Sequence, residues 1–157
     1  MLLSAFFSSA ETSMMALNRY RLKHLVQKRD KSARRVSKLL NRTDRLLGVI
    51  LIGNNFVNIL ASVIATLIAV RLWGDSGIFA VTIIMTLVVL IFAEVTPKAI
   101  AALKPESIAF PASYVLRPLS NLLKPLVTAI NIISNSLTKL VGVNPETEID
   151  DELNPEE

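Results

Sequence analysis

The chain has 157 residues, of which 52% are hydrophobic and only 6% aromatic, and its mean hydropathy is +0.49. This composition predicts an all-α integral membrane domain rich in aliphatic residues. The sequence has no cysteine, which excludes disulfides and thiolate metal sites, and its single histidine, His24, lies among basic residues, which argues against a zinc site or a Ser-His-Asp triad. We therefore do not expect an enzyme.

Residues 1–17 are mostly apolar but contain several hydroxyl side chains and Glu11. A membrane-spanning helix needs about 20 apolar residues, so we interpret this stretch as a first transmembrane helix that is truncated at its start. A signal peptide is the less favoured alternative, because the basic residues follow the apolar stretch instead of preceding it.

Residues 18–45 form a strongly basic segment that holds 11 of the 17 Lys and Arg residues but only two acids, Asp30 and Asp44. Such a cluster could bind nucleic acid. Between apolar segments it is better explained as a cytoplasmic segment that follows the positive-inside rule, with the N-terminus outside, so no nucleic-acid partner is expected. Its apolar residues keep helical spacing, which predicts one or two amphipathic helices at the membrane interface. Thr43 and Asp44 are candidate caps for the next helix.

Two complete spans follow, at residues 46–73 and 78–103, joined by a short outer turn with Trp73 as an interfacial anchor. In the first span Asn54, Asn58 and Ser62 share one face. Prolines recur every six or seven residues from Pro105 onward, which predicts juxtamembrane helices over residues 105–143 in place of a fourth crossing. Residues 144–157 contain seven acids and two prolines and are predicted to be a linker.

Glu94 is the most informative residue of the second span. Residues 78–92 before it carry no charge, and an ionisable side chain inside a membrane is costly enough to indicate function. Pro97 has no N–H, so the carbonyl of Ala93 loses its helical partner next to the carboxylate. Two oxygen sources then lie side by side, as a hard cation requires.

Three polar residues lie at one predicted depth. Ser9 is ten residues before Arg19, Asn54 is nine after Arg45, and Glu94 is ten before Lys104. At about 1.5 Å per residue, each lies roughly 13–15 Å from the basic end of its helix. We therefore predict a shared metal site near the middle of the membrane, whose members come from all three helices: Ser8, Ser9, Gly53, Asn54, Asn58, Ala93 and Glu94. Ser9 is preferred over Ser8 because of its depth.

The donor types do not select one cation, because hydroxyl, amide, carboxylate and carbonyl oxygens admit magnesium, sodium, calcium or manganese. Two explanations are equally good for Glu11. It shares a helical face with Ser8 and could belong to the site, or it pairs with Lys98 or with a basic residue of the cytoplasmic segment, since charges in membranes usually pair. Most of the other hydroxyl and amide side chains, including Ser4 and Asn55, are expected to be hydrogen-bonding links between helices.

Three motifs together resemble the transmembrane domain of the CorC and cyclin M (CNNM) family of magnesium transporters. They are the run from Phe7 to Thr12, the Gly53-Asn54 pair followed by Asn58, and the run from Glu94 to Lys98. The resemblance implies three transmembrane helices with a juxtamembrane helix, a homodimer in the cell (inner) membrane, and Mg²⁺ export coupled to Na⁺ entry. By the same resemblance, Ser9 with the adjacent Ser8, Gly53, Asn54 and Glu94 would surround the ion.

The resemblance also implies a cytoplasmic CBS-domain pair that binds ATP, which is absent from this chain. Two further functions remain as alternatives. The chain could be a non-transporting membrane anchor or a cation-sensing regulatory module. An intramembrane enzyme is a distant third, because no nucleophile and base stand out.

Overall fold

The structure is a computed structural model that describes residues 1–140, and within them it contains helices and no strands. The predicted linker at residues 144–157 lies outside this range, as do the last three residues of the predicted juxtamembrane segment. The described chain forms two compact units, residues 1–121 and the part that begins at Leu122. Each unit is described by itself.

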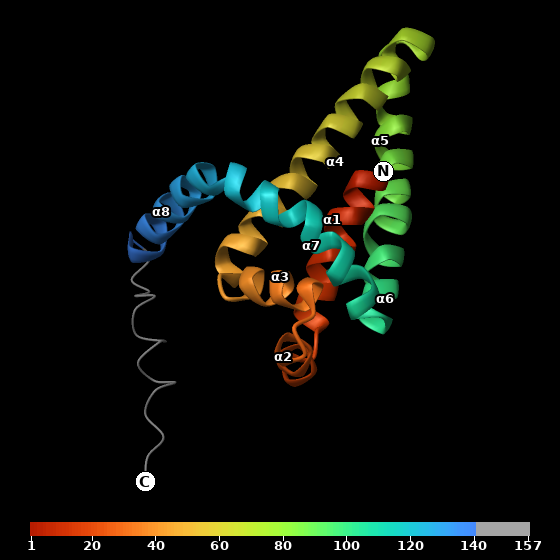
Figure 1. Ribbon diagram of the computed structural model, residues 1–157. Coiled ribbons are helices and arrows are strands. Elements are labelled where there is room, and N and C mark those ends of the chain that lie inside the picture. Colours follow the sequence, from red (N-terminus) through yellow and green to blue (C-terminus); the bar gives the residue numbers. More distant parts are fainter. Residues whose placement is uncertain (141–157) are drawn as a thin grey trace. The chain divides into compact units, whose positions relative to one another are not determined.

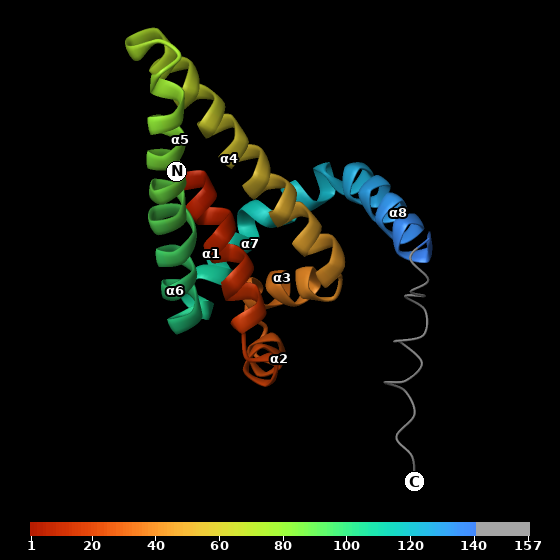
Figure 2. The same cartoon turned by 180° about the vertical axis from the view of Figure 1, so that it is seen from behind.

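Helix α1 (Leu2–Ala16) is the central element of the first unit. It lies between α4 (Thr43–Trp73) and a long helical rod that runs through α5 (Gly77–Val88), η1 (Val89–Val95) and α6 (Thr96–Leu103). Figures 1 and 2 show α4 and α5 diverging from their common turn, with α1 in the space between α4 and α6. Three apolar helices therefore pack together as the sequence predicts.

Two of these helical segments are long and apolar enough to cross a membrane, Thr43–Trp73 and Gly77–Leu103. Most of their large apolar side chains are exposed, including Phe56, Leu67 and Phe92. Helix α1 has 15 residues and is shorter than a span. The exposed apolar surface of α4 and α5 is suited to contact with lipid.

The basic segment folds into two helices, α2 (Arg19–Gln27) and α3 (Lys31–Leu40). Each begins at a side chain that accepts two backbone hydrogen bonds, Asn18 for α2 and Asp30 for α3. Both helices are amphipathic, and α3 buries Val36 and Leu39. Two short helices agree with the prediction for this segment.

Helix α4 begins at Thr43, three residues before the start expected from the sequence. Arg42 occupies the N-cap position, and no side chain caps the helix. The Thr43 hydroxyl donates to the carbonyl of Leu40 at 2.8 Å, so the capping role expected for Thr43 is wrong. Asp44 lies in the first turn, where its negative charge favours the helix N-terminus.

The hydrophobic core lies at the basic end of the first unit. It joins α1, α2, α3 and the start of α4 to α7 (Pro105–Leu122). Met14, Leu46 and Leu116 are among its largest fully buried side chains. Small residues of α7, Ala109 and Ala112, are also buried and allow the helix to approach closely.

The proline-rich region is more continuously helical than its pattern indicates. Pro111 and Pro118 lie inside α7 instead of ending it. In the second unit, α8 (Lys124–Leu140) is a single amphipathic helix with several exposed large aliphatic residues.

Gly53 allows close packing between α1 and α4. A Cβ atom built on Gly53 would lie 2.5 Å from the Cζ atom of the Phe7 ring. Phe7 itself is only 8% exposed, so its ring covers the glycine face of α4. Any larger residue at position 53 must displace this ring.

Gly53→Ala is therefore expected to destabilise the folded domain by about 1–3 kcal/mol, as overpacking does. Replacing the ring by the smaller side chain in Phe7→Leu should relieve the clash. The double variant should therefore be more stable than the sum of the two single-variant losses of stability predicts. Thermal unfolding of the four proteins in detergent measures this coupling. Strictly additive losses would show that the two side chains do not compete for space.

Candidate cation site

Glu94 lies in a π-helical segment, η1, directly after the uncharged stretch of residues 76–93. The N–H of Thr96 donates to the carbonyl of Ile91, five residues earlier, and Pro97 has no N–H to offer to Phe92 or Ala93. Ala93 is fully buried and Glu94 is half-buried. The widened helix therefore places a carboxylate beside carbonyl groups whose usual helical donor is absent.

Asn54 faces α1 from α4. Its Oδ1 atom accepts a hydrogen bond from the hydroxyl of Ser4 at 3.0 Å. Ser4 is completely buried and Asn54 is half-buried. The polar link between the two helices is thus made by Ser4, which agrees with the linking role expected for that residue.

Ser8 is the unusual hydroxyl of α1. It is 1% exposed, one turn after Ser4, and its Oγ atom is a buried polar side-chain atom without a hydrogen-bond partner. Burying an unpaired hydroxyl costs about 1–3 kcal/mol. A bound ligand that accepts a hydrogen bond from this hydroxyl, or a cation that its oxygen coordinates, would remove that cost.

Ser9, which the depth argument preferred, is half-buried and donates its hydroxyl to the carbonyl of Phe6 at 3.0 Å. Its proton is therefore used within its own helix. The neighbouring Ser8 has the unsatisfied hydroxyl. Ser8 is therefore the stronger candidate of the two for a cation ligand.

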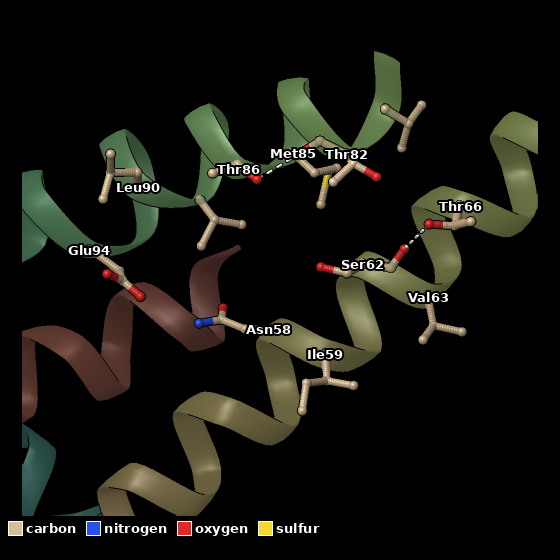
Figure 3. Close-up of a pocket in the computed structure, with 12 residues that line it drawn as sticks. Asn58, Ile59, Ser62, Val63, Thr66, Thr82, Met85, Thr86, Leu90 and Glu94 are labelled. Atoms are coloured by element: carbon tan, nitrogen blue, oxygen red, sulfur yellow. Dashed lines mark hydrogen bonds between the residues drawn. The ribbon is translucent and has the colours of Figure 1, made fainter. Parts of the chain in front are cut away.

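A cleft of about 470 Å³ separates α4 from α5 and η1. Figure 3 shows Asn58 and Glu94 pointing into it from opposite helices. The polar residues that line the cleft come from both sides: Asn58, Ser62, Thr66, Thr82, Thr86 and Glu94. The remaining wall is apolar and includes Met85 and Leu90.

The threonine hydroxyls of this cleft make the same kind of hydrogen bond. Thr66, Thr82 and Thr86 each donate to the carbonyl four residues earlier, at 2.8–2.9 Å. Because their protons are used in this way, these oxygens can only accept from a group in the cleft. The cleft therefore offers acceptor oxygens along its length and a carboxylate at Glu94, which suits a cation.

Glu11 and Lys98 form an ion pair between α1 and α6, with 3.6 Å between Oε2 and Nζ. The structure thus confirms the pairing that was one of the two explanations for Glu11. Both side chains are about two-fifths exposed, at 41% and 44%. Glu94 is left as the acidic residue of the cleft, and no group of three or more His, Cys, Asp or Glu side chains gathers anywhere in the described residues.

Of the predicted site residues, the structure brings Asn58 and Glu94 to one cleft and Gly53 and Asn54 to the face of α4 that packs on α1. The roles of Thr82 and Thr86 were missed. Their signal was present in the sequence, because Thr82, Thr86 and Glu94 recur at multiples of four residues and so share one helical face. Threonines among apolar residues do not stand out without the facing helix.

The fold and the site define an all-α integral membrane domain with a polar, cation-suited cleft between its helices. Over residues 1–157 the sequence matches the family described as Cyclin M transmembrane N-terminal domain. The chain belongs to this cyclin M (CNNM) family, and the resemblance of its motifs to the CorC and cyclin M proteins is confirmed.

One of the relatives is described as an inner membrane protein. The chain is 49% identical over 155 residues to the UPF0053 inner membrane protein YfjD of Escherichia coli, covering 99% of this chain and 36% of that protein. It is 45% identical over 143 residues to a UPF0053 protein of Haemophilus influenzae, covering 91% and 34%. A polyamine export protein of Salmonella typhimurium is 26% identical over 162 residues, covering 89% and 34%. The chain therefore spans about a third of the length of these relatives.

Ser8→Ala and Ser4→Ala should differ in their effect on stability. Removing the unpaired Ser8 hydroxyl should leave the stability of the ion-free domain unchanged or raise it by about 1 kcal/mol. Removing the Ser4 hydroxyl breaks the bond to Asn54 and should lower it by about 0.6–2 kcal/mol. Thermal unfolding in detergent with a chelator compares the two variants. A loss in Ser8→Ala as large as that in Ser4→Ala would mean that the Ser8 hydroxyl has a partner.

Proposed function

We propose that this chain is the ion-binding membrane domain of a transporter that exports Mg²⁺ in exchange for Na⁺. The observation that carries the proposal is Glu94, the only charged residue of the π-helical segment η1, which faces neutral oxygen donors across a cleft. Magnesium prefers oxygen ligands, and a carboxylate supplies the charge that a dehydrated divalent cation requires. Membership of the cyclin M family supports the same class of function.

The donor set comes from three helices. Glu94 supplies the negative charge, and the amide oxygens of Asn54 or Asn58 with the hydroxyl of Ser8 replace water molecules around the ion. Ser9 offers the lone pairs of an oxygen whose proton is already donated to Phe6. The Ala93 carbonyl is a further donor that the missing N–H of Pro97 leaves available. Gly53 acts indirectly, because it lets Phe7 and α1 approach α4.

Alternating access needs an element that can change shape, and η1 is suited to that role. π-Helical segments are often found at functional sites, and broken helices line the ion sites of many transporters. A shift of η1 between π and α geometry would rotate Glu94 relative to α4. Lys98, held to Glu11, would keep α6 attached to α1 during this movement.

The whole transporter is proposed to be a homodimer in the cell (inner) membrane, with the N-terminus outside and the basic segment inside. The positive-inside rule supports this orientation. The exposed apolar side chains of α4 and α5 would contact lipid or the second copy. A cytoplasmic CBS-domain pair would follow the membrane domain in the full-length protein.

Glu94→Gln is expected to abolish stabilisation by Mg²⁺ while leaving the domain folded, because it removes the charge with little change in shape. Glu11→Gln is the matched control, since it removes one acid from α1 outside the cleft. A ligand that binds only the folded state stabilises it by about 2.7 kcal/mol at 100 times its Kd. Thermal unfolding at increasing Mg²⁺, Na⁺ and Ca²⁺ measures this shift.

An equal Mg²⁺ response in the parent and in Glu94→Gln would contradict the proposed site. Binding without flux would instead support the alternative of a cation-sensing module or membrane anchor. Vesicles that contain the full-length protein separate these two functions, because only a transporter moves Mg²⁺ when a Na⁺ gradient is imposed.

A second candidate function is the export of an organic polycation. The volume of the cleft and its mixture of acceptor oxygens, apolar wall and one carboxylate suit an aliphatic chain with ammonium ends. One relative of the family is described as a polyamine export protein, which gives this class of substrate some support.

A bulky residue in the cleft separates the two cations. Ser62→Leu should fill the cleft away from Glu94, so it should abolish stabilisation by 1,4-diaminobutane and leave stabilisation by Mg²⁺ intact. Asn55→Leu places a leucine on α4 outside the cleft and serves as the control for the apolar substitution itself. Thermal unfolding with each cation is the measurement. Failure of the diamine to stabilise the parent protein would exclude it as a ligand.

A further inference from the structure

A second, positively charged pocket lies within the first unit, at the basic end of α4. It has a volume of about 130 Å³ and lies between α3, the start of α4 and α7. Five cationic side chains line it, together with the buried Ser120: Arg35, Lys38, Arg42, Arg45 and Arg117. No acidic side chain is among its lining residues.

Four of these cations come from the junction of α3 and α4. Arg35 and Lys38 are three residues apart on one face of α3, and Arg42 and Arg45 lie at the N-cap position and in the first turn of α4. The other face of α3 is held in the core by Val36 and Leu40. The cationic face is thus directed away from the core, and α7 adds Arg117.

One of the arginines is fixed in place. The Arg35 guanidinium lies 3.5 Å from the centre of the Tyr114 ring and donates to Ser32 at 2.9 Å and to Ser113 at 3.4 Å. These contacts join α3 to α7 without neutralising the charge. A rigid, planar guanidinium is well suited to bind phosphate oxygens.

The charges of the pocket are not balanced within the part of the chain that the structure describes. Its two ion pairs there are Arg21–Glu106 and Lys98–Glu11, and neither involves a pocket residue. Like charges at neighbouring helical positions repel one another. A bound anion would remove this repulsion, so the pocket is built for a strongly negative group.

The position of the pocket favours a membrane lipid as the source of such an anion. Arg42 and Arg45 lie at the start of a helix that can span a membrane, and the exposed Leu51 follows within two turns. A lipid bound here would place its headgroup among the cations and its chains along the apolar surface of α4. Basic pockets at this level of membrane proteins bind acidic lipid headgroups.

We propose that this pocket binds the phosphate group of an anionic phospholipid. The lipid joins α3, α4 and α7 at the membrane surface and stabilises the basic end of the domain. This site is separate from the cleft at Glu94, with which it shares no lining residue.

The test is native mass spectrometry of the full chain titrated with phosphatidylglycerol, with phosphatidylcholine, or with inorganic phosphate alone. The parent protein should retain phosphatidylglycerol in preference to phosphatidylcholine. Each Lys or Arg near an acidic lipid surface contributes to the binding free energy, and the loss of two should weaken lipid binding about 30-fold. We therefore expect this loss in Arg42→Gln/Arg117→Gln.

The control is Lys28→Gln/Arg34→Gln, which removes the same charge from exposed positions outside the pocket. It should bind phosphatidylglycerol as the parent does. Thermal unfolding without lipid checks that both double variants fold. An equal loss in the two variants would overturn the proposal in favour of general charge attraction. No preference for phosphatidylglycerol would overturn it directly, and inorganic phosphate binding as tightly would exclude the lipid as the specific ligand.

Discussion

Glu94 is a carboxylate in a helical stretch that is otherwise uncharged from Gly77 to Val95, and much of the local structure can be related to that constraint. An acid in this environment requires polar partners. The chain surrounds it with a π-helical segment, a following proline and, across the cleft, Asn58 and a series of acceptor oxygens. These groups cannot balance its charge, so the arrangement favours a cationic ligand over a closed internal network.

Helix α1 provides the packing that holds this arrangement. Its Phe7 ring covers Gly53, its Ser4 hydroxyl is bonded to Asn54, and its Glu11 is paired with Lys98 on α6. One short helix therefore fixes both walls of the site. Ser8 lies on the same helix, fully surrounded but unpaired, so α1 combines a structural role with a polar atom that its packing leaves unsatisfied.

The two ends of the first unit have complementary electrostatics. The cleft near Glu94 presents oxygen acceptors, whereas the pocket between α3, α4 and α7 presents cations. The hydrophobic core lies at the basic end, where α1, α3, α4 and α7 meet. Anchoring of that end at the membrane surface would leave the more exposed α4–α5 segment, whose side chains pack little within the chain, as the part able to change conformation.

The sequence was enough to predict the all-α class, the apolar segments, one or two helices in the basic segment, Glu94 with its proline, and the family. Each of these depends on hydropathy, charge order or local motifs, which need no partner helix. The contacts between polar side chains could be seen only in the tertiary structure. It paired Ser4 with Asn54, left Ser8 unpaired, placed Phe7 on Gly53 and extended α7 through two prolines. Neighbouring serines lie at nearly the same depth but on different sides of their helix, and the rotation of that helix is fixed by packing between helices.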